Sequence, residues 1–205
     1  MKPFSRKFST VVLASLALVS TNVCATSSGA NMSIWIDVGG PVGGPYATVV
    51  QNGAKQAAED LGANLRVVYS DWQPQKMIEN FKQAVAASPS GIIIMGHPGD
   101  SAYQPLVTEA ETKGINVTSI DTALPASMNA MQNKGFGYVG VSNAKRGIKL
   151  ATEALRRGQF KAGDRALVWG IKDIAERSKS TRGMIKTLEQ AGLTVDFLSN
   201  ISRNR

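Results

Sequence analysis

The sequence predicts an α/β protein: a three-layer αβα, doubly wound parallel sheet, followed by an incomplete second α/β lobe. Apolar runs of strand length alternate along the chain with stretches in which apolar residues recur at helical spacing. Such alternation implies parallel strands joined by right-handed crossovers. Glycines that suit left-handed helix ends close four of the helical stretches, at Gly62, Gly114, Gly158 and Gly192.

The first 25 residues are typical of a secretory signal. A basic start with Lys2 and Arg6 precedes the apolar run 11–19, and the small residues at 23–25 suit cleavage after Ala25. A membrane anchor is the alternative, but nine apolar residues are too few to span about 30 Å of hydrocarbon. We therefore expect an exported protein, with a flexible leader over residues 26–32 after the signal.

Charge and composition argue against several functions. The chain has 23 Lys and Arg against 15 Asp and Glu, a net charge of +8, and three of these cations precede the expected cleavage site. The remaining excess is spread over short clusters instead of a basic stripe with aromatic residues, so nucleic-acid binding is not expected. His97 is the only histidine, which excludes paired-histidine catalysis and a histidine-rich metal site. We expect neither a metal nor a cofactor.

Seven strands are predicted from short apolar or alternating runs. They span residues 33–38, 64–69, 91–95, 116–120, 137–141, 166–169 and 194–198. Helices are predicted between them because apolar residues share one face, for example Val50, Ala54 and Leu61, and later Ile148, Ala151 and Leu155. Five strands are enough for one lobe over residues 33–142, and only two remain for a partial second lobe over 143–205.

Polar residues follow the predicted strands at their carboxyl ends, the edge at which open α/β sheets bind ligands. His97 comes after strand 91–95, and Asp121 ends strand 116–120. Tyr46 stands near the first helix, after the glycine-rich loop 38–46. That loop fails the dinucleotide pattern, so we expect it to let a ligand approach backbone N–H groups. A carboxylate such as Asp121 can accept hydrogen bonds from the hydroxyls of a polyol.

Signals for an enzyme are weak. Asp37 and Asp71 also end strands, which leaves a carboxylate-pair hydrolase conceivable, although no sequence feature fixes their separation. No G-x-S-x-G elbow is present. Asp100 is expected to cap the helix that follows it. Arg177 and Arg182 flank a predicted helix start, where either guanidinium could bind a ligand or remain solvated.

The chain resembles the periplasmic sugar-binding proteins of ABC importers, the ribose-binding type in particular. The resemblance rests on GPYATVVQNGAKQAAEDLG, IIIMGHPGDSA, KGINVTSIDT, YVGVSNAKRGIKLA and RGMIKTLEQAGL, which occur in the family's order between residue 33 and about 198. It implies a type I periplasmic binding protein with two lobes that close over a sugar. Family members are longer, so the resemblance also implies that this sequence is truncated.

Further expectations follow by position. Tyr46 stands where the family stacks an aromatic ring on the sugar, His97 where it has a polar residue, and Asp121 where an aspartate accepts sugar hydroxyls. Thr122 takes a position at which ribose binders have arginine, which leaves the sugar open. The family's second-lobe arginine matches Arg177 or Arg182. Asn143 matches an asparagine at the lobe crossover and is expected to be structural.

The resemblance implies a non-enzymatic function: a periplasmic, monomeric substrate-binding component that presents a monosaccharide to a membrane permease. Two alternatives stay open. One is a periplasmic receptor that passes a sugar or quorum signal to a chemoreceptor or sensor kinase. The other is an exported α/β enzyme that acts on a sugar.

Overall fold

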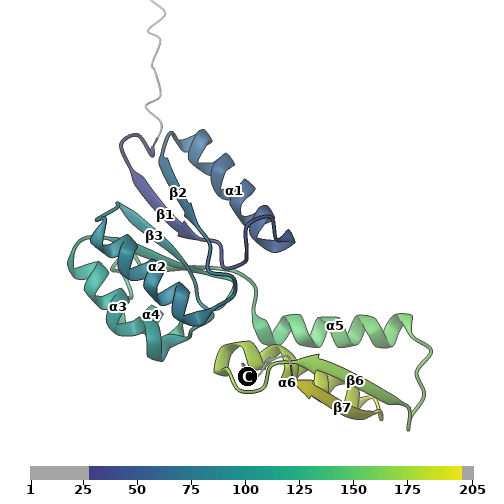
Figure 1. The fold of residues 1–205 in the computed structure, drawn as a ribbon. Coiled ribbons are helices and arrows are strands. Elements are labelled where there is room, and N and C mark those ends of the chain that lie inside the picture. Colours follow the sequence, from purple (N-terminus) through teal and green to yellow (C-terminus); the bar gives the residue numbers. More distant parts are fainter. Residues whose placement is uncertain (1–27, 200–205) are drawn as a thin grey trace, which may run out of the picture.

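The computed structural model describes residues 28–199, in which strands and helices alternate as expected (Figure 1). The predicted signal and residues 26–27 lie outside this range. The strands are β1 (Ser33–Asp37), β2 (Asn64–Val68), β3 (Gly91–Met95), β4 (Asn116–Ile120), β5 (Gly137–Val139), β6 (Arg165–Gly170) and β7 (Thr194–Ser199). The helices are α1 (Pro45–Leu61), α2 (Pro74–Ala86), α3 (Asp100–Thr112), α4 (Pro125–Ala130), α5 (Asn143–Arg157) and α6 (Ala175–Gln190).

The first five strands form one parallel sheet in the order β2-β1-β3-β4-β5. The chain starts at β1, adds β2 on one side, and then crosses to the other side for β3, β4 and β5. The strand order therefore reverses between β1 and β3. At such a reversal the loops after neighbouring strands leave toward opposite faces and open a crevice at the carboxyl edge of the sheet.

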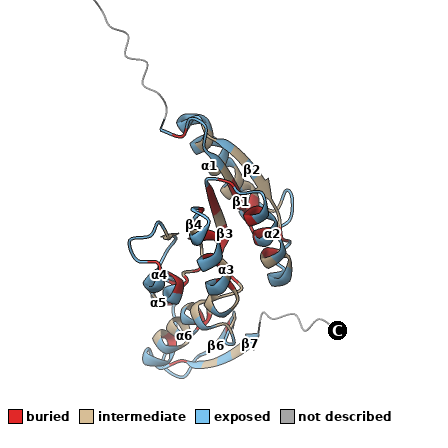
Figure 2. Cartoon of the chain, turned by 90° about the vertical axis from the view of Figure 1, so that its left-hand side faces the viewer, coloured by how far each residue is buried: buried red, intermediate tan, exposed pale blue. Residues whose placement is uncertain are grey.

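Helices cover both faces of this sheet, which confirms the three-layer prediction. Side chains of α2 and α3 pack on one face, and α1 packs on the other, where Ala47 joins Ile36 and Val38. In Figure 2 the buried residues concentrate on β1, β3 and parts of α2 and α3. The main cluster contains Trp35, Phe81, Ala84, Val85, Ile92, Ile94, Tyr103, Val107, Ala110, Ile115, Val117, Leu124 and Met131.

β6 and β7 form a separate parallel pair, packed on one face by α5 and α6 through a core of Ala151, Val168, Leu188 and Leu193. The opposite face carries the exposed side chains of Leu167, Trp169 and Leu198. Residues 140–164, which include α5, connect the two sheets. The division into lobes at residue 142 stays a prediction.

No helix within residues 28–199 has the length and apolar character needed to span a membrane.

Several local expectations are corrected. Gly62, Gly114 and Gly192 have the left-handed conformation, but Gly158 is extended, with φ −81° and ψ 148°. The short helix α4 was not predicted, because its N-cap is Leu124 and its apolar pattern is too short to detect.

Asp100 does not cap its own helix. Its carboxylate accepts hydrogen bonds from the backbone N–H groups of Ala126 and Ser127, at 3.0 and 2.9 Å, and so caps α4 instead. A cap formed between segments this far apart in the chain cannot be read from local spacing.

A flexible leader over residues 26–32 stays a prediction, and residues 28–32 of that segment are described by the structure. The structure places them in a turn in which the backbone N–H of Gly29 donates to the carbonyl oxygen of Leu61 at 2.9 Å, and Met32 donates to Gly29. This turn ties the start of β1 to the end of α1.

Tyr103 offers a test of the core. Its ring is fully buried against Phe81 at 5.7 Å, and its hydroxyl has no hydrogen-bond partner within the described residues. Because an unpaired buried hydroxyl is unfavourable, we expect Tyr103→Phe to raise the free energy of unfolding by about 1 kcal/mol. Tyr69→Phe is the matched control, since the Tyr69 hydroxyl donates to Gln51 Oε1 at 2.7 Å and its loss should be destabilising. A melting temperature lower for Tyr103→Phe than for the wild type would contradict this expectation.

Candidate functional site

The candidate site lies at the carboxyl ends of β1, β3 and β4, beside the reversal in strand order. The structure brings together three residues predicted from separate segments. Asp121, after β4, contacts His97, after β3, and the ring of Trp72 lies between His97 and Tyr46. These four residues, with Arg146 and Arg177, are called the rim cluster below.

Asp121 is the charged centre of the rim cluster. Its Oδ2 lies 2.9 Å from His97 Nε2 and accepts a longer bond, 3.4 Å, from Thr122 Oγ1. Its Oδ1 lies 3.5 Å from Arg146 Nη1. The hydrogen bond from His97, aided by the nearby arginines, lowers the pKa of the Asp121 carboxyl despite its partial burial. The side chain stays 20% exposed, so an ionised oxygen is accessible to a ligand.

The backbone at the site is strained. Asp121, Asp71 and Trp72 all have left-handed conformations, with φ of 59°, 52° and 60°. Each such residue costs about 1–3 kcal/mol, and they cluster at functional sites. The hydroxyl of Tyr138 lies 3.1 Å from the carbonyl oxygen of Asp121 and helps to hold that turn.

His97 is buried and orients Asp121. A carboxylate only accepts hydrogen bonds, so His97 Nε2 must carry the proton that points at Asp121 Oδ2. Burial lowers the pKa of the imidazole, an effect that the hydrogen bond to Asp121 opposes and the positive charge of Arg177 reinforces. The ring is therefore neutral near pH 7. With only 6% of the residue exposed, His97 is better placed to position Asp121 than to contact a ligand.

Three rings form a row along the rim. The Trp72 ring stacks on His97 with centroids 5.4 Å apart and planes 23° apart, and it contacts Tyr46 at 5.4 Å with a tilt of 57°. Tyr46 and Trp72 are both exposed. Aromatic faces next to a carboxylate can pack on the C–H face of a polyol while the carboxylate binds its hydroxyls.

The glycine-rich loop makes room for this row. A Cβ on Gly39 or Gly40 would lie 2.9 or 3.1 Å from atoms of the Trp72 ring. The N–H groups of both glycines are already bonded, to Asp37 Oδ1 and to the carbonyl oxygen of Val38. The absence of side chains at these two glycines leaves space for the Trp72 ring. The sequence suggested that a ligand could approach N–H groups of this loop, but those of Gly39 and Gly40 are already used.

The two candidate arginines have different positions. Arg177, at the start of α6, is partly buried, and its charge acts on both His97 and Asp121. It donates no hydrogen bond to any residue in the described range, and burial lowers its pKa. Arg182 lies five residues further, about 140° around the helix, where it is exposed and donates to the carbonyl oxygen of Ala175 at 3.4 Å. The structure therefore places Arg177 in the rim cluster and Arg182 on another side of α6.

Thr122 lies beneath the rim. It is 1% exposed, and its hydroxyl points to Asp121. It can support the carboxylate, but it is too buried to contact a ligand directly in this conformation.

Asp37 is built into the fold. Its carboxylate accepts hydrogen bonds from Gly39 N–H, Ser70 Oγ and Asn80 Nδ2 at 2.8–2.9 Å, and it is 4% exposed. Burial raises its pKa, although these bonds oppose the rise. Asp71 is exposed and paired with Lys76. The two carboxylates that could have formed a hydrolytic pair thus have structural partners instead.

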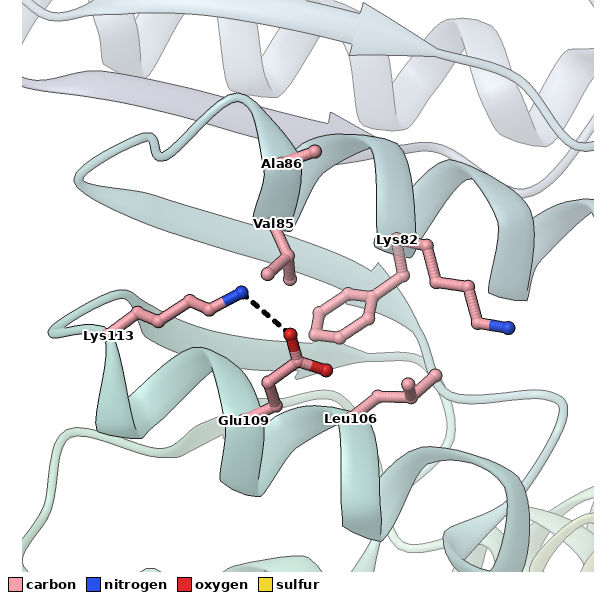
Figure 3. A pocket seen from close by; sticks show the side chains of 7 residues that line it. Lys82, Val85, Ala86, Leu106, Glu109 and Lys113 are labelled. Carbon is pink, nitrogen blue, oxygen red and sulfur yellow. Dashed lines mark hydrogen bonds and ion pairs between the residues drawn. The ribbon is translucent and has the colours of Figure 1, made fainter.

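Other hollows lack the chemistry of the rim cluster. A cavity of about 120 Å³ lies between α2 and α3, where the Glu109–Lys113 ion pair of 2.7 Å borders it (Figure 3). It is lined by the later turns of both helices, away from the rim. A larger groove of about 330 Å³ lies beside α1 and is mainly apolar. Within residues 28–199, no group of three or more His, Cys, Asp or Glu side chains could hold a metal ion.

Sequence reasoning missed Trp72 and Arg146. Trp72 follows the end of β2 by four residues, so the rule that found His97 and Asp121, inspection of every strand's carboxyl end, could have found it. Arg146 lies in the first turn of α5. Whether its side chain contacts Asp121 depends on the direction of α5 relative to the end of β4, and no local sequence pattern predicts that direction.

The protonation of His97 can be measured directly, because it is the only histidine. In a chain purified without a histidine tag, we expect an NMR titration of its ring protons to give a pKa below 6.5. Asp121→Asn should lower this pKa further, because the carboxylate stabilises the charged ring.

The shifted pKa of His97 also affects stability. A depressed pKa means that the unfolded chain binds the proton first as the pH falls. Stability should therefore decline from about pH 6.5 down to the folded pKa, and His97→Gln should remove that part of the decline. A measured pKa above 6.5 would show that burial does not dominate at this ring.

Open α/β sheets bind ligands at a switch point of this kind, where this chain has aromatic rings and a charged carboxylate. The chain belongs to the periplasmic binding protein family: the sequence profile described as periplasmic binding protein domain matches residues 38–202. A search of curated proteins found no match.

Solved structures with the same fold include periplasmic sugar-binding proteins. An ABC sugar transporter (periplasmic sugar binding protein) from Legionella pneumophila is 25% identical, with a TM-score of 0.68 over 82% of this chain and 60% of that one. A glucose-galactose binding protein from Geobacillus stearothermophilus is 24% identical, with a TM-score of 0.69 over 82% and 57%. A periplasmic ribose ABC transporter from Conexibacter woesei is 20% identical, with a TM-score of 0.66 over 87% and 57%. The chain spans about 60% of the length of these structures.

Proposed function

We propose that the chain is the substrate-binding component of an ABC-type sugar importer, acts in the periplasm, and presents a monosaccharide to the membrane permease. The observation that carries the proposal is the rim cluster: an accessible, ionised Asp121 next to the exposed rings of Tyr46 and Trp72. The names of the similar structures, which refer to sugar binding and ABC transport, support it.

The roles of the rim residues follow from their contacts. Asp121 accepts hydrogen bonds from sugar hydroxyls, and His97 holds its carboxylate in place. Tyr46 and Trp72 pack on the ring of the sugar. Arg177 donates to the sugar from α6, since its guanidinium is partly buried and gives no hydrogen bond within residues 28–199. We assign the second-lobe arginine to Arg177, because Arg182 is directed elsewhere.

The proposal contains no catalytic step. An acid–base role for Asp121 would have to use its hydrogen-bonded partner His97, whose ring is buried, because Asp37 is enclosed by three partners of its own. The alternative of a sugar-processing enzyme would require turnover at this rim. The alternative of a periplasmic receptor uses the same ligand site. It differs only in the partner that recognises the ligand-bound chain, which would be a chemoreceptor or sensor kinase.

The test is a thermal melt of the chain, expressed from its full sequence and purified, with and without a panel of pentoses and hexoses at millimolar concentration. A sugar at 100 times its Kd should add about 2.7 kcal/mol of stability. NMR of the same mixtures over hours distinguishes binding from turnover. A melt that no sugar raises would overturn the proposal, and formation of a product would favour the enzyme.

A further inference from the structure

Arg146 makes the contact between α5 and the end of β4. Its Nη2 donates to Asn143 Oδ1 at 2.7 Å, and Asn143 is buried. Its Nη1 lies 3.5 Å from Asp121 Oδ1. Arg146 Nη2 is therefore held by Asn143, while Nη1 faces Asp121 at the rim.

The contact with Asp121 is loose. Charge-assisted N–H···O bonds are usually about 2.7–2.9 Å long, so 3.5 Å is well beyond the optimum. The other oxygen of Asp121 already has His97 and Thr122 as donors. Oδ1 is therefore the acceptor of Asp121 with the most capacity left, and it lies next to a guanidinium N–H that is itself poorly satisfied.

This pair matches the chemistry of neighbouring hydroxyl groups. A hydroxyl can donate one hydrogen bond and accept others, a carboxylate oxygen only accepts, and a guanidinium only donates. Two hydroxyls on adjacent carbons can therefore bind together, one donating to Asp121 Oδ1 and the other accepting from Arg146. A sugar that lacks either hydroxyl would leave a charged group without its partner, which sites of this kind reject strongly.

We propose that Arg146 is a ligand-binding residue which, together with Asp121, binds two neighbouring hydroxyls of the sugar and discriminates against analogues that lack either one. The inference rests on the proposed function and adds to it a residue and the part of the sugar that this residue recognises. Lysine could not replace this arginine, because a single ammonium cannot bind Asn143 and a hydroxyl in the same planar arrangement.

The experiment measures the affinity of the wild type, Arg146→Gln and Arg146→Lys by calorimetry. The ligand is the sugar of the panel that stabilises the wild type most, and its monodeoxy analogues follow. We expect both variants to lose at least about tenfold in affinity, as for a lost hydrogen bond to a charged group. For one deoxy analogue, the affinity of the wild type should be at least about tenfold lower than its affinity for the parent sugar. The Arg146→Gln variant should bind that analogue no more weakly than it binds the parent sugar.

Lys145→Gln is the matched control. It removes the same charge one position earlier, at an exposed side chain on α5. Its affinity should stay within about twofold of the wild type. Unliganded Arg146→Gln should still fold, and its melting temperature should fall by no more than the loss of the hydrogen bond to Asn143 predicts, because the exposed pair with Asp121 contributes little to stability.

The outcomes separate the two proposals. If the wild type binds a sugar and Arg146→Gln binds it equally well, the role of Arg146 is wrong and the proposed function stands. The diol assignment would also be overturned if Arg146→Gln lowered the affinity for every deoxy analogue by the same factor as for the parent sugar. Arg146 would then contact none of the hydroxyls that the analogues lack. If no sugar binds the wild type, the proposed function fails and this inference fails with it.

Discussion

Replacing Asp121 with asparagine is expected to weaken sugar binding by about 100-fold or more while the unliganded chain still folds. Asparagine keeps the size of the side chain and tolerates the left-handed conformation, φ 59°, which alanine would occupy less readily. It can still accept the hydrogen bond of His97. The lost element is the charge that strengthens bonds to sugar hydroxyls, and truncating a buried charged partner typically costs 2–5 kcal/mol.

The measurement is the affinity for the panel sugar together with the melting temperature without sugar. The unliganded variant should lose about 1 kcal/mol of stability, because a neutral amide accepts the bond from His97 more weakly than the carboxylate does. Asp196→Asn is the control, since Asp196 pairs with Arg165 on the exposed face of the second sheet, remote from the rim. Sugar binding by Asp121→Asn at wild-type affinity would show that Asp121 is not the ligand carboxylate.

The same carboxylate sets a pH dependence. Its pKa in the folded chain is below the ordinary value of 3.8, mainly because of the bond from His97. The stability that this ionised group contributes is therefore present above about pH 4 and is lost as the pH falls through the folded pKa. Below about pH 6.5, the lowered pKa of His97 opposes folding instead, because the unfolded chain binds the proton first. The titrations of Asp121 and His97 therefore both depend on the hydrogen bond between these two residues.

Much of the fold could be predicted from the sequence because the signals are local. All seven strands lie within about two residues of their expected positions, since buried parallel strands produce apolar runs such as Gly91–Met95. Predictions of local structure were wrong where that structure depends on residues far away in the chain. The cap that Asp100 gives to α4 depends on residues 126 and 127, and Gly158 is extended, although a glycine there suggests a left-handed cap.

The site was predicted in part for a related reason. Asp121 and His97 follow neighbouring strands of a parallel sheet, so their meeting follows from strand order alone. Trp72 could have been noted as a residue after β2, but its direction toward the rim depends on two successive left-handed residues, Asp71 and Trp72, which sequence patterns do not predict. Arg146 reaches it from a helix that belongs to the second α/β unit. The roles of His97 and Thr122 also depend on burial, which their positions after strands did not reveal.

Gly96→Ala is expected to destabilise the first sheet and to disturb the site at the same time. Gly96 follows β3, and its N–H donates to the carbonyl oxygen of Ile120 at 3.3 Å. A Cβ at this position would lie 2.0 Å from the carbonyl oxygen of Thr122. That atom belongs to the backbone, so no side-chain rotation can relieve the clash, and the ends of β3 and β4 must separate.

Overpacking of this kind typically costs about 1–3 kcal/mol, and occasionally more. The displaced segment carries His97 on one side and Asp121 on the other, so the 2.9 Å contact between them should be lost together with stability. A thermal melt and an NMR titration of His97 measure the two effects separately. The His97 pKa should fall below its wild-type value, because the ring loses the carboxylate that favours its charged form.

Gly53→Ala is the matched control for Gly96→Ala. Gly53 lies within α1, and a Cβ there would meet no atom within 4 Å. Because alanine is favoured over glycine in a helix by about 0.5–1 kcal/mol, this variant should raise the melting temperature. If both variants melted at or above the wild-type temperature, the close approach of Gly96 to Thr122 would not constrain the fold.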